Sequence, residues 1–140
     1  MINLANFSSI FMANWKLNGN IDFINQYYQK LLISNENCVV VCSSSIFLNK
    51  LKTNNKNLYI GAQDVSIYKQ GSYTGELSAT MLEENNVKFC LVGHSERRKY
   101  FNEKNDTVKI KASNLIENNI IPVICIGETL EEKEKKLTKE

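Results

Sequence analysis

The sequence contains little of several residue types and patterns that mark special classes of protein. A single proline and six glycines in 140 residues argue against linkers and low-complexity segments. A formal net charge of +2 is too small to indicate a nucleic-acid or membrane partner. No segment approaches the roughly 20 apolar residues of a membrane helix, and the N-terminus lacks the basic and apolar regions of a signal peptide. Because 43% of the residues are hydrophobic and 23% are charged, we expect a soluble, cytoplasmic chain with an ordinary globular core.

The cysteines also lack the patterns of metal and redox sites. None of the four forms a Cys-x-x-Cys pair, and the chain has a single histidine, whereas zinc sites cluster such ligands. Each cysteine lies in a run rich in Val, Ile, Leu or Phe. We therefore expect no metal and four buried free thiols in a reducing compartment, at Cys38, Cys42, Cys90 and Cys125.

Short apolar runs recur along the chain and predict five strands. Their apolar character is continuous rather than alternating, which is typical of strands that are buried on both faces of a parallel sheet. The five runs are 10–13, 39–42, 58–61, 89–92 and 122–126.

Longer amphipathic segments follow the apolar runs and predict helices over 21–32, 46–51, 78–84, 106–117 and from 129 onward. Asp106 is placed to cap the fourth helix, and the pairs Glu131/Lys135 and Glu132/Lys136 support the last one. Five strand–helix units of about 25 to 30 residues predict an α/β fold with a parallel sheet. An open doubly wound sheet and a closed barrel both fit this order. No Gly-x-Gly-x-x-Gly or Walker loop follows a strand, which argues against a nucleotide site.

Polar residues follow four of the five predicted strands, where α/β proteins place their chemistry. If the sheet is parallel, these segments converge on one face: 14–16, 63–64, 94–98 and 127–128. Each also has an ordinary explanation, since Lys16 fits a surface lysine, Asn14 fits a turn former, and Arg97 and Arg98 fit surface ion pairs.

The segment around His94 has a more specific setting. Gly93 permits a tight exit from the strand, and Ser95 is a good N-cap for the following turn. The positive end of a helix dipole favours a neutral imidazole, which donates an N–H to a carbonyl oxygen and stabilises an enolate there. Glu96, in the same turn, is expected to pair with Lys16 and hold its ammonium in place.

Five motifs occur in an order that resembles the triosephosphate isomerase family over the whole length of the chain. They are Ala-Asn-Trp-Lys-Leu-Asn-Gly at 13–19, Gly-Ala-Gln-Asp at 61–64, Tyr-Thr-Gly-Glu at 73–76, Val-Gly-His-Ser-Glu-Arg-Arg at 92–98 and Cys-Ile-Gly-Glu at 125–128. The resemblance implies a (β/α)₈ barrel, which needs about 250 residues. Residues 1–140 are then expected to be the N-terminal part of a single barrel domain, a truncated chain that holds an incomplete barrel of about five units.

The resemblance also implies an activity and roles for individual residues. The family interconverts dihydroxyacetone phosphate and glyceraldehyde 3-phosphate through an enediolate, without metal or organic cofactor. Asn14 matches a substrate-binding residue, and Lys16 matches the lysine that offsets the charge of phosphate and enediolate. His94 matches the electrophile, Ser95 the residue that hydrogen-bonds the base, and Glu96 the acid beside the lysine.

A long loop matches the segment with which the family forms homodimers. The resemblance implies that this loop, Gln63 through Glu76 with Thr74 at its tip, crosses to the partner subunit and braces the Asn and His there. The residues assigned to the dimer contact are Gln63, Thr74, Gly75 and Glu76. Two departures affect only loop rigidity: Ser43–Ser45 stand where prolines are common, and Asp64 stands where Asn is also common.

The parts that the resemblance does not find in these 140 residues are the glutamate base, the closing loop and the glycine-rich phosphate site. Without a positioned base the chain is expected to be inactive by itself. The alternative is a non-catalytic half-barrel that acts as a binding or dimerising module. In either case an open half-barrel is expected to expose two sheet edges and a hydrophobic face.

Overall fold

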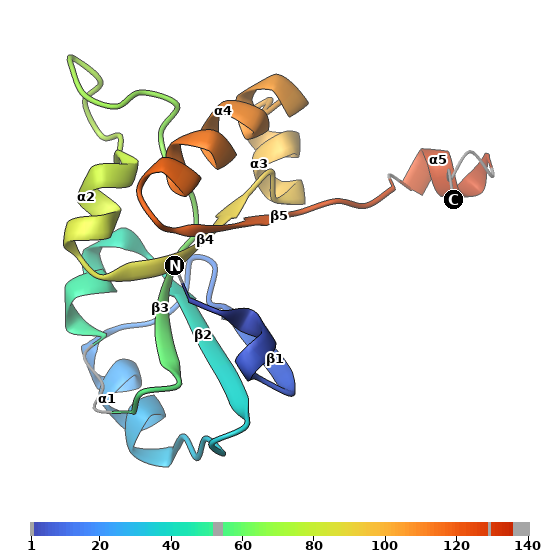
Figure 1. Cartoon of the computed structure of the whole chain (residues 1–140). Coiled ribbons are helices and arrows are strands. Elements are labelled where there is room, and N and C mark those ends of the chain that lie inside the picture. The colour runs from blue at the N-terminus through green and yellow to red at the C-terminus, as the bar shows by residue number, and fades with distance from the viewer. Residues whose placement is uncertain (1, 52–54, 129, 136–140) are drawn as a thin grey trace.

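The computed structural model shows five parallel strands that lie side by side in chain order (Figure 1). It describes residues 2–51, 55–128 and 130–135. The strands are β1 (Ser9–Asn14), β2 (Asn37–Ser43), β3 (Leu58–Ala62), β4 (Val87–Val92) and β5 (Ile121–Ile124). All five predicted strands are confirmed, although β5 ends two residues before its predicted end. A doubly wound sheet reverses its strand order part-way, so the unbroken order favours the barrel alternative.

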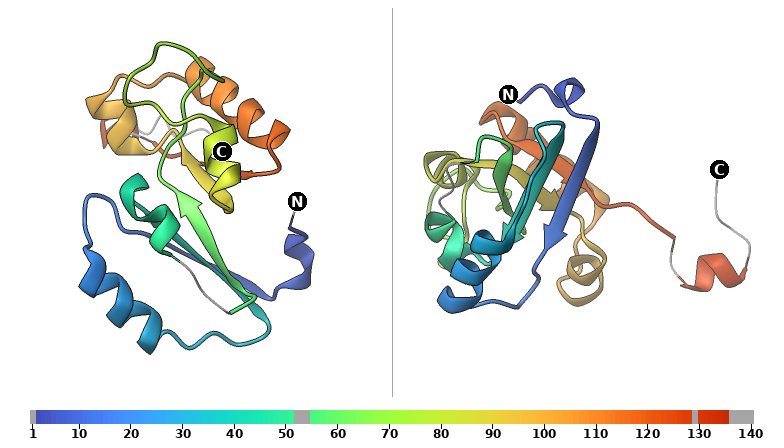
Figure 2. Two further views of the ribbon diagram at one scale, coloured as in Figure 1. Left: turned by 90° about the vertical axis from the view of Figure 1, so that its left-hand side faces the viewer. Right: turned by 90° about the horizontal axis from the view of Figure 1, so that it is seen from below.

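The helices are α1 (Ile21–Lys30), α2 (Ala79–Glu84), α3 (Ser95–Tyr100), α4 (Asn105–Glu117) and α5 (Leu130–Glu134), with 3₁₀ turns η1 (Leu4–Asn6) and η2 (Ser45–Lys50). α1, α2 and α4 cover one side of the curled sheet, whereas α5 stands away from it (Figures 1 and 2). The segment predicted as a helix over 46–51 is thus a 3₁₀ turn, and α3 was predicted only as a turn. The result is a curled half-barrel of five parallel strands with α1, α2 and α4 on its outside.

Two details of the predicted helices differ from the structure. Asp106 is not a cap, because α4 begins one residue earlier and Asp106 lies inside its first turn. The predicted start of the last helix at Thr129, and Lys136 with its pairing to Glu132, lie outside the described residues. The predicted pair of Lys135 with Glu131 is confirmed.

The core lies on both faces of the middle strands. On the outer face, β3 and β4 pack against α2 and α4, and β1 to β3 pack against α1 and η2. On the inner face a third cluster combines Cys38, Val40 and Cys42 of β2 with Phe89 and Leu91 of β4. The prediction of burial on both faces therefore holds for the middle of the sheet.

The same prediction is wrong for the two outermost strands. Phe11 of β1 is 56% exposed and Ile124 of β5 is 52% exposed. Each of these strands has a neighbour on one side only. Phe11 and Ile124 pair in register with Val39 and Val92, which belong to the outer clusters, so both side chains lie on the outer face at the edges of the sheet. Continuous apolar character thus predicts a strand correctly, whereas burial also depends on the elements that cover its faces.

The cysteines are free thiols, as predicted. Cys38, Cys42 and Cys90 are buried, and Cys125 is partly buried. Burial is the main cause that raises the pKa of the Cys42 thiol, to about 12. Within the described ranges no cluster of His, Cys, Asp and Glu is suited to hold a metal ion. Nor does any helix of that part combine the length and apolar character that a membrane crossing requires.

Candidate active site at the carboxyl ends of the strands

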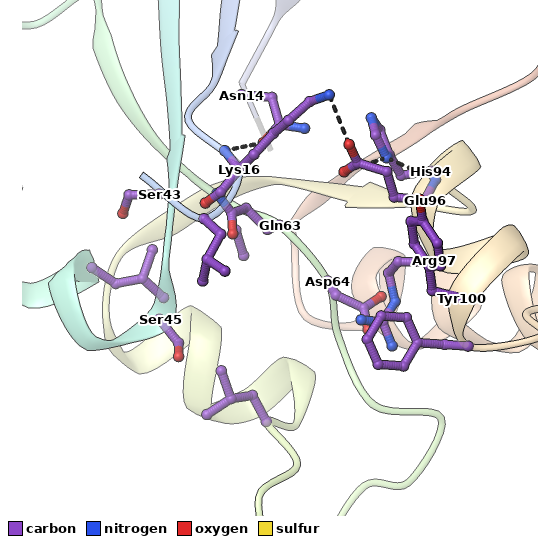
Figure 3. Close-up of a pocket in the computed structure, with 15 residues that line it drawn as sticks. Asn14, Lys16, Ser43, Ser45, Gln63, Asp64, His94, Glu96, Arg97 and Tyr100 are labelled. Atoms are coloured by element: carbon purple, nitrogen blue, oxygen red, sulfur yellow. Dashed lines mark hydrogen bonds and ion pairs between the residues drawn. The ribbon is translucent and has the colours of Figure 1, made fainter. Parts of the chain in front are cut away.

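The ends of β1, β3 and β4 meet around an open pocket of about 530 Å³ (Figure 3). Five of the predicted site residues line it: Asn14, Lys16, Gln63, His94 and Glu96. The predicted convergence fails for the end of the fifth strand, because Gly127 and Glu128 are exposed and do not line the pocket. In Figure 1 the chain after β5 runs away from the sheet.

The turn after β1 holds Lys16 in an unusual backbone conformation, with φ of +52°. Its N–H donates to Asn14 Oδ1 at 2.9 Å, and its carbonyl oxygen accepts from Gln63 Nε2 at 2.8 Å. The N–H of Trp15 donates to the carbonyl of Cys42 at 3.0 Å, which ties the turn to β2. Asn14 is therefore a turn former, as its ordinary explanation has it, and it also lines the pocket.

His94 is itself the N-cap of α3, which corrects the prediction that Ser95 has this role. Its Nδ1 accepts from the backbone N–H of Glu96 at 3.3 Å, and Ser95 is the first helical residue, exposed and outside the pocket. The imidazole reaches the N–H two residues ahead and so takes the place of a Ser or Thr oxygen. Because Nδ1 acts as an acceptor, the neutral ring carries its proton on Nε2.

Gly93 shapes the exit from β4 that brings His94 into the pocket. Its φ is +69°, and a Cβ there would lie 2.9 Å from Val108 Cγ2 and 2.8 Å from Arg98 Nη2. Its N–H donates to Glu103 Oε2 at 3.2 Å, and its carbonyl accepts from Arg98 Nε at 2.7 Å. Both the conformation and the close packing therefore require a glycine at this position.

We expect Gly93→Ala to lower the free energy of unfolding by about 2 kcal/mol or more, from left-handed strain and the contact with Val108. Urea denaturation followed by circular dichroism measures the change. Gly127→Ala is the matched control, since nothing lies within 4 Å of its Cβ position and its φ is not positive. The control is expected to stay within about 0.5 kcal/mol of the wild type. Equal losses of unfolding free energy in the two variants would contradict the requirement for glycine at position 93.

The predicted pairing of Lys16 with Glu96 is confirmed, with 2.8 Å between Nζ and Oε1 (Figure 3). The hydrogen bond from Lys16 is the largest cause that lowers the pKa of Glu96 below its usual value. The second oxygen of Glu96 lies 3.4 Å from His94 Nδ1. An ammonium and an imidazole N–H donor thus share one pocket, which is an arrangement that stabilises a substrate oxygen carrying negative charge.

A cluster of buried and partly buried charges lies beside the pocket. Lys111 Nζ lies 2.7 Å from Asp64 Oδ1 and also binds Glu103 Oε1, and Arg97 Nε lies 2.8 Å from Asp64 Oδ2. Burial is the main cause that raises the pKa of Asp64, and the hydrogen bond and charge of Lys111 oppose it. The cluster joins the end of β3 to α3 and α4. It therefore fixes the helix that carries Glu96.

Sequence reasoning missed Lys111 and Glu103 because neither follows a strand directly. The sequence does contain a signal for Lys111, since it lies three residues after Val108 and four before Leu115, on the buried stripe of α4. A charged residue on an apolar stripe indicates a buried partner. Arg97, for which a surface ion pair was one explanation, forms a partly buried ion pair with Asp64.

The long loop after β3 reaches the pocket only at its two ends, through Gln63, Asp64 and Leu77. Ser66 N donates to Leu77 O at 2.8 Å and closes the base of the loop, and the rings of Tyr68 and Tyr73 stack at 3.5 Å. Figure 1 shows the loop projecting from the body between β3 and α2. Three predicted loop residues are exposed and do not line the pocket: Thr74, Gly75 and Glu76.

Comparison with known proteins decides the family. A family model described as triosephosphate isomerase matches residues 9–140. The chain belongs to the triosephosphate isomerase family. Among its relatives, the triosephosphate isomerase of Clostridium tetani is 40% identical over 137 residues, covering 94% of this chain and 54% of that protein. The triosephosphate isomerase of Mesomycoplasma hyorhinis is 39% identical over 139 residues, covering 93% of this chain and 57% of that protein.

The fold comparison agrees with the sequence comparison. The crystal structure of triosephosphate isomerase from Bartonella henselae matches with a TM-score of 0.82 at 29% identity, covering 91% of this chain and 55% of that chain. The predicted incomplete barrel of the triosephosphate isomerase fold is thereby confirmed. The chain spans about half the length of the curated relatives it matches.

Proposed function

We propose that residues 1–140 are the N-terminal part of a single barrel domain of a cytoplasmic triosephosphate isomerase, which interconverts dihydroxyacetone phosphate and glyceraldehyde 3-phosphate. The observation that carries the proposal is the Lys16–Glu96 pair beside His94. Two segments 80 residues apart place the Lys16 ammonium and the His94 imidazole in one pocket. A triose phosphate enediolate carries negative charge, and this pair of donors stabilises it.

In the proposed reaction each pocket residue has a distinct role. His94 Nε2–H donates to the substrate oxygens and moves a proton between them, while Lys16 offsets the negative charge. Asn14 contacts the substrate through its amide in addition to holding the turn. Glu96 holds the Lys16 ammonium. Ser95, which is exposed in this structure, is assigned by the resemblance to hydrogen-bond the base.

The reaction also requires a base that removes a proton from carbon. The two carboxylates that line the pocket are both engaged, Glu96 with Lys16 and Asp64 with Lys111 and Arg97. We propose that the base and the phosphate-binding loops belong to the part of the family that these residues do not match. The 140 residues then hold the electrophilic side of the site and do not catalyse the reaction alone.

The test compares the bare chain with a chimera. The chimera joins residues 1–140 to the part of the Clostridium tetani relative that lies beyond the matched region. Both are produced in a host from which the endogenous isomerase gene is deleted, and glyceraldehyde 3-phosphate turnover is measured by a coupled assay. We expect no turnover above the solution rate for the bare chain and clear turnover for the chimera.

Turnover by the bare chain would overturn the proposed division of the site. A folded chimera without turnover would favour the alternative, a non-catalytic half-barrel that binds or dimerises. The urea transition of the chimera distinguishes this outcome from misfolding.

We further propose that the full-length protein is a homodimer. Large apolar side chains line the pocket and yet are exposed, namely Leu17 at 96%, Tyr100 at 67% and Phe101 at 66%. Such exposure around a polar site indicates a surface that another chain covers. The projecting loop, with Thr74 near its tip, is the segment that the resemblance assigns to the partner's pocket.

A further inference from the structure

The side chain of Gln63 lies inside the pocket rather than along the projecting loop to which the resemblance assigns it (Figure 3). Its Nε2 donates to the carbonyl oxygen of Lys16 at 2.8 Å and to that of Cys42 at 3.2 Å. Gln63 directly follows β3, whereas Lys16 follows β1 and Cys42 belongs to β2. One amide thus joins the ends of three strands at the point where the Lys16 turn begins.

The turn at Lys16 needs such support. A left-handed backbone costs a residue with a side chain about 1–2 kcal/mol, and Lys16 has a φ of +52°. Its N–H is held by Asn14 Oδ1, and Gln63 is the closer of the two side chains that donate to its carbonyl, at 2.8 Å against 3.5 Å for Ser44 Oγ. The direction in which the side chain leaves the backbone is set by this conformation. The flexible lysine chain then reaches Glu96 with Nζ 2.8 Å from Oε1.

The chemistry of the contact requires an amide nitrogen. Both partners of Gln63 Nε2 are carbonyl oxygens, which only accept hydrogen bonds. A glutamate of the same shape would place a carboxylate oxygen against two carbonyl oxygens. A glutamate at position 63 would therefore lose both donated hydrogen bonds.

We propose that Gln63 is a positioning residue of the site. Its amide fixes the left-handed Lys16 backbone and so directs the Lys16 ammonium toward Glu96 and the pocket. The functional role of the Lys16 ammonium rests on the proposed function, because it offsets the charge of a substrate only if the chain is part of an isomerase. The contact itself can be tested without any turnover.

The experiment labels lysines in the 140-residue chain with a limiting amount of acetic anhydride and measures each site by mass spectrometry. Lys30, which is exposed on α1, is the reference, and Lys111, which is 4% exposed, shows in the same sample that the fold is intact. In the wild type we expect slower labelling at Lys16 than at Lys30, since Glu96 holds its ammonium. In Gln63→Glu we expect labelling at Lys16 to rise about two- to fivefold relative to Lys30, as for the loss of an exposed ion pair, with Lys111 still protected.

Two further variants test whether the change in Lys16 labelling comes from the lost hydrogen bonds of Gln63 rather than from the added charge. Gln29→Glu makes the same chemical change at an exposed position of α1 and is expected to leave the labelling of Lys16 unchanged. Gln63→Met keeps the length of the side chain, adds no charge and removes both N–H groups, so it is expected to raise Lys16 labelling like Gln63→Glu. If Lys111 loses its protection only in Gln63→Glu, the labelling of Lys16 in Gln63→Met is the measurement that tests the proposal.

Several outcomes would overturn the proposal. They are unchanged labelling at Lys16 in a Gln63 variant that keeps Lys111 protected, wild-type labelling at Lys16 equal to Lys30, and wild-type labelling at Lys111 equal to Lys30. Loss of Lys111 protection in both Gln63 variants would also overturn it, because Gln63 would then support the whole fold rather than Lys16. A selective rise at Lys16 together with an inactive chimera would leave this inference standing and count against the proposed function alone.

Discussion

Replacing His94 with Asn is expected to lower kcat of the chimera by about 10²- to 10⁴-fold, the usual contribution of a positioned acid–base group. His94 Nδ1 accepts from the backbone of Glu96, so in the proposed reaction Nε2 carries the proton that is donated to the substrate. An asparagine amide can donate a hydrogen bond but cannot pass a proton between two substrate oxygens. Because Lys16 and Asn14 remain in place, KM is expected to change much less than kcat.

The choice of asparagine separates catalysis from helix capping. Asn is among the preferred N-cap residues, so its Oδ1 can accept from the Glu96 N–H that His94 Nδ1 holds in the wild type. The urea transition of the variant is therefore expected to stay close to that of the parent chimera. His94→Gln, which has a longer amide side chain, is expected to lose as much kcat. Retention of kcat within about tenfold in both variants would contradict the role of His94 as electrophile.

Replacing Lys111 with Met is expected to lower the free energy of unfolding by about 3–5 kcal/mol, the usual cost of removing one partner from a buried ion pair. The Lys111 ammonium lies between Asp64 and Glu103, and the side chain of Glu103 is only 3% exposed. Without Lys111, Asp64 keeps Arg97 at 2.8 Å, while Glu103 keeps the Gly93 N–H at 3.2 Å and shares the same Arg97 at 3.8 Å. These contacts do not compensate two carboxylates, so most of the stability of a small domain is lost.

The matched control is Lys109→Met on the same helix, which removes an exposed lysine and is expected to change the urea midpoint little. The double variant Lys111→Met/Glu103→Gln removes one charge of each sign and is expected to recover part of the loss. Equal urea midpoints for Lys111→Met and Lys109→Met would contradict the stabilising role of the contacts that Lys111 makes with Asp64 and Glu103.

The pH dependence gives the Lys111→Met result a second check. Burial already raises the pKa of Asp64, and loss of Lys111 removes the hydrogen bond and charge that oppose this rise. A carboxyl whose folded pKa is raised favours the folded state when it is protonated, and that contribution is lost as the pH rises through the folded pKa. The deficit of Lys111→Met relative to the wild type is therefore expected to be largest at neutral pH and to shrink on acidification. A deficit that grows on acidification would contradict this explanation.

The strands and the family were predictable from local patterns. Five continuous apolar runs became β1 to β5, and the motifs around Asn14, Gln63 and His94 followed their ends as expected. The predictions of helix caps and of burial were wrong where the local sequence fits more than one arrangement of the surrounding residues. Asp106 and Ser95 are good capping residues, but α4 begins one residue before Asp106 and His94 already caps α3. Phe11 was expected to be buried, but it lies on the outer face at the edge of the sheet, where burial depends on the elements that cover that face.

The sequence by itself determined the strand–helix order, the family and the residues that carry the proposed chemistry, because these depend on short segments whose residues are adjacent in the chain. Only the tertiary structure decided which side chains hold these residues in place. The contacts of Gln63 with Lys16 and of Lys111 with Asp64 each join residues 47 positions apart, and Lys16 meets Glu96 across 80. Such contacts depend on the register of neighbouring strands and on the packing of α4 against them, which no local pattern contains.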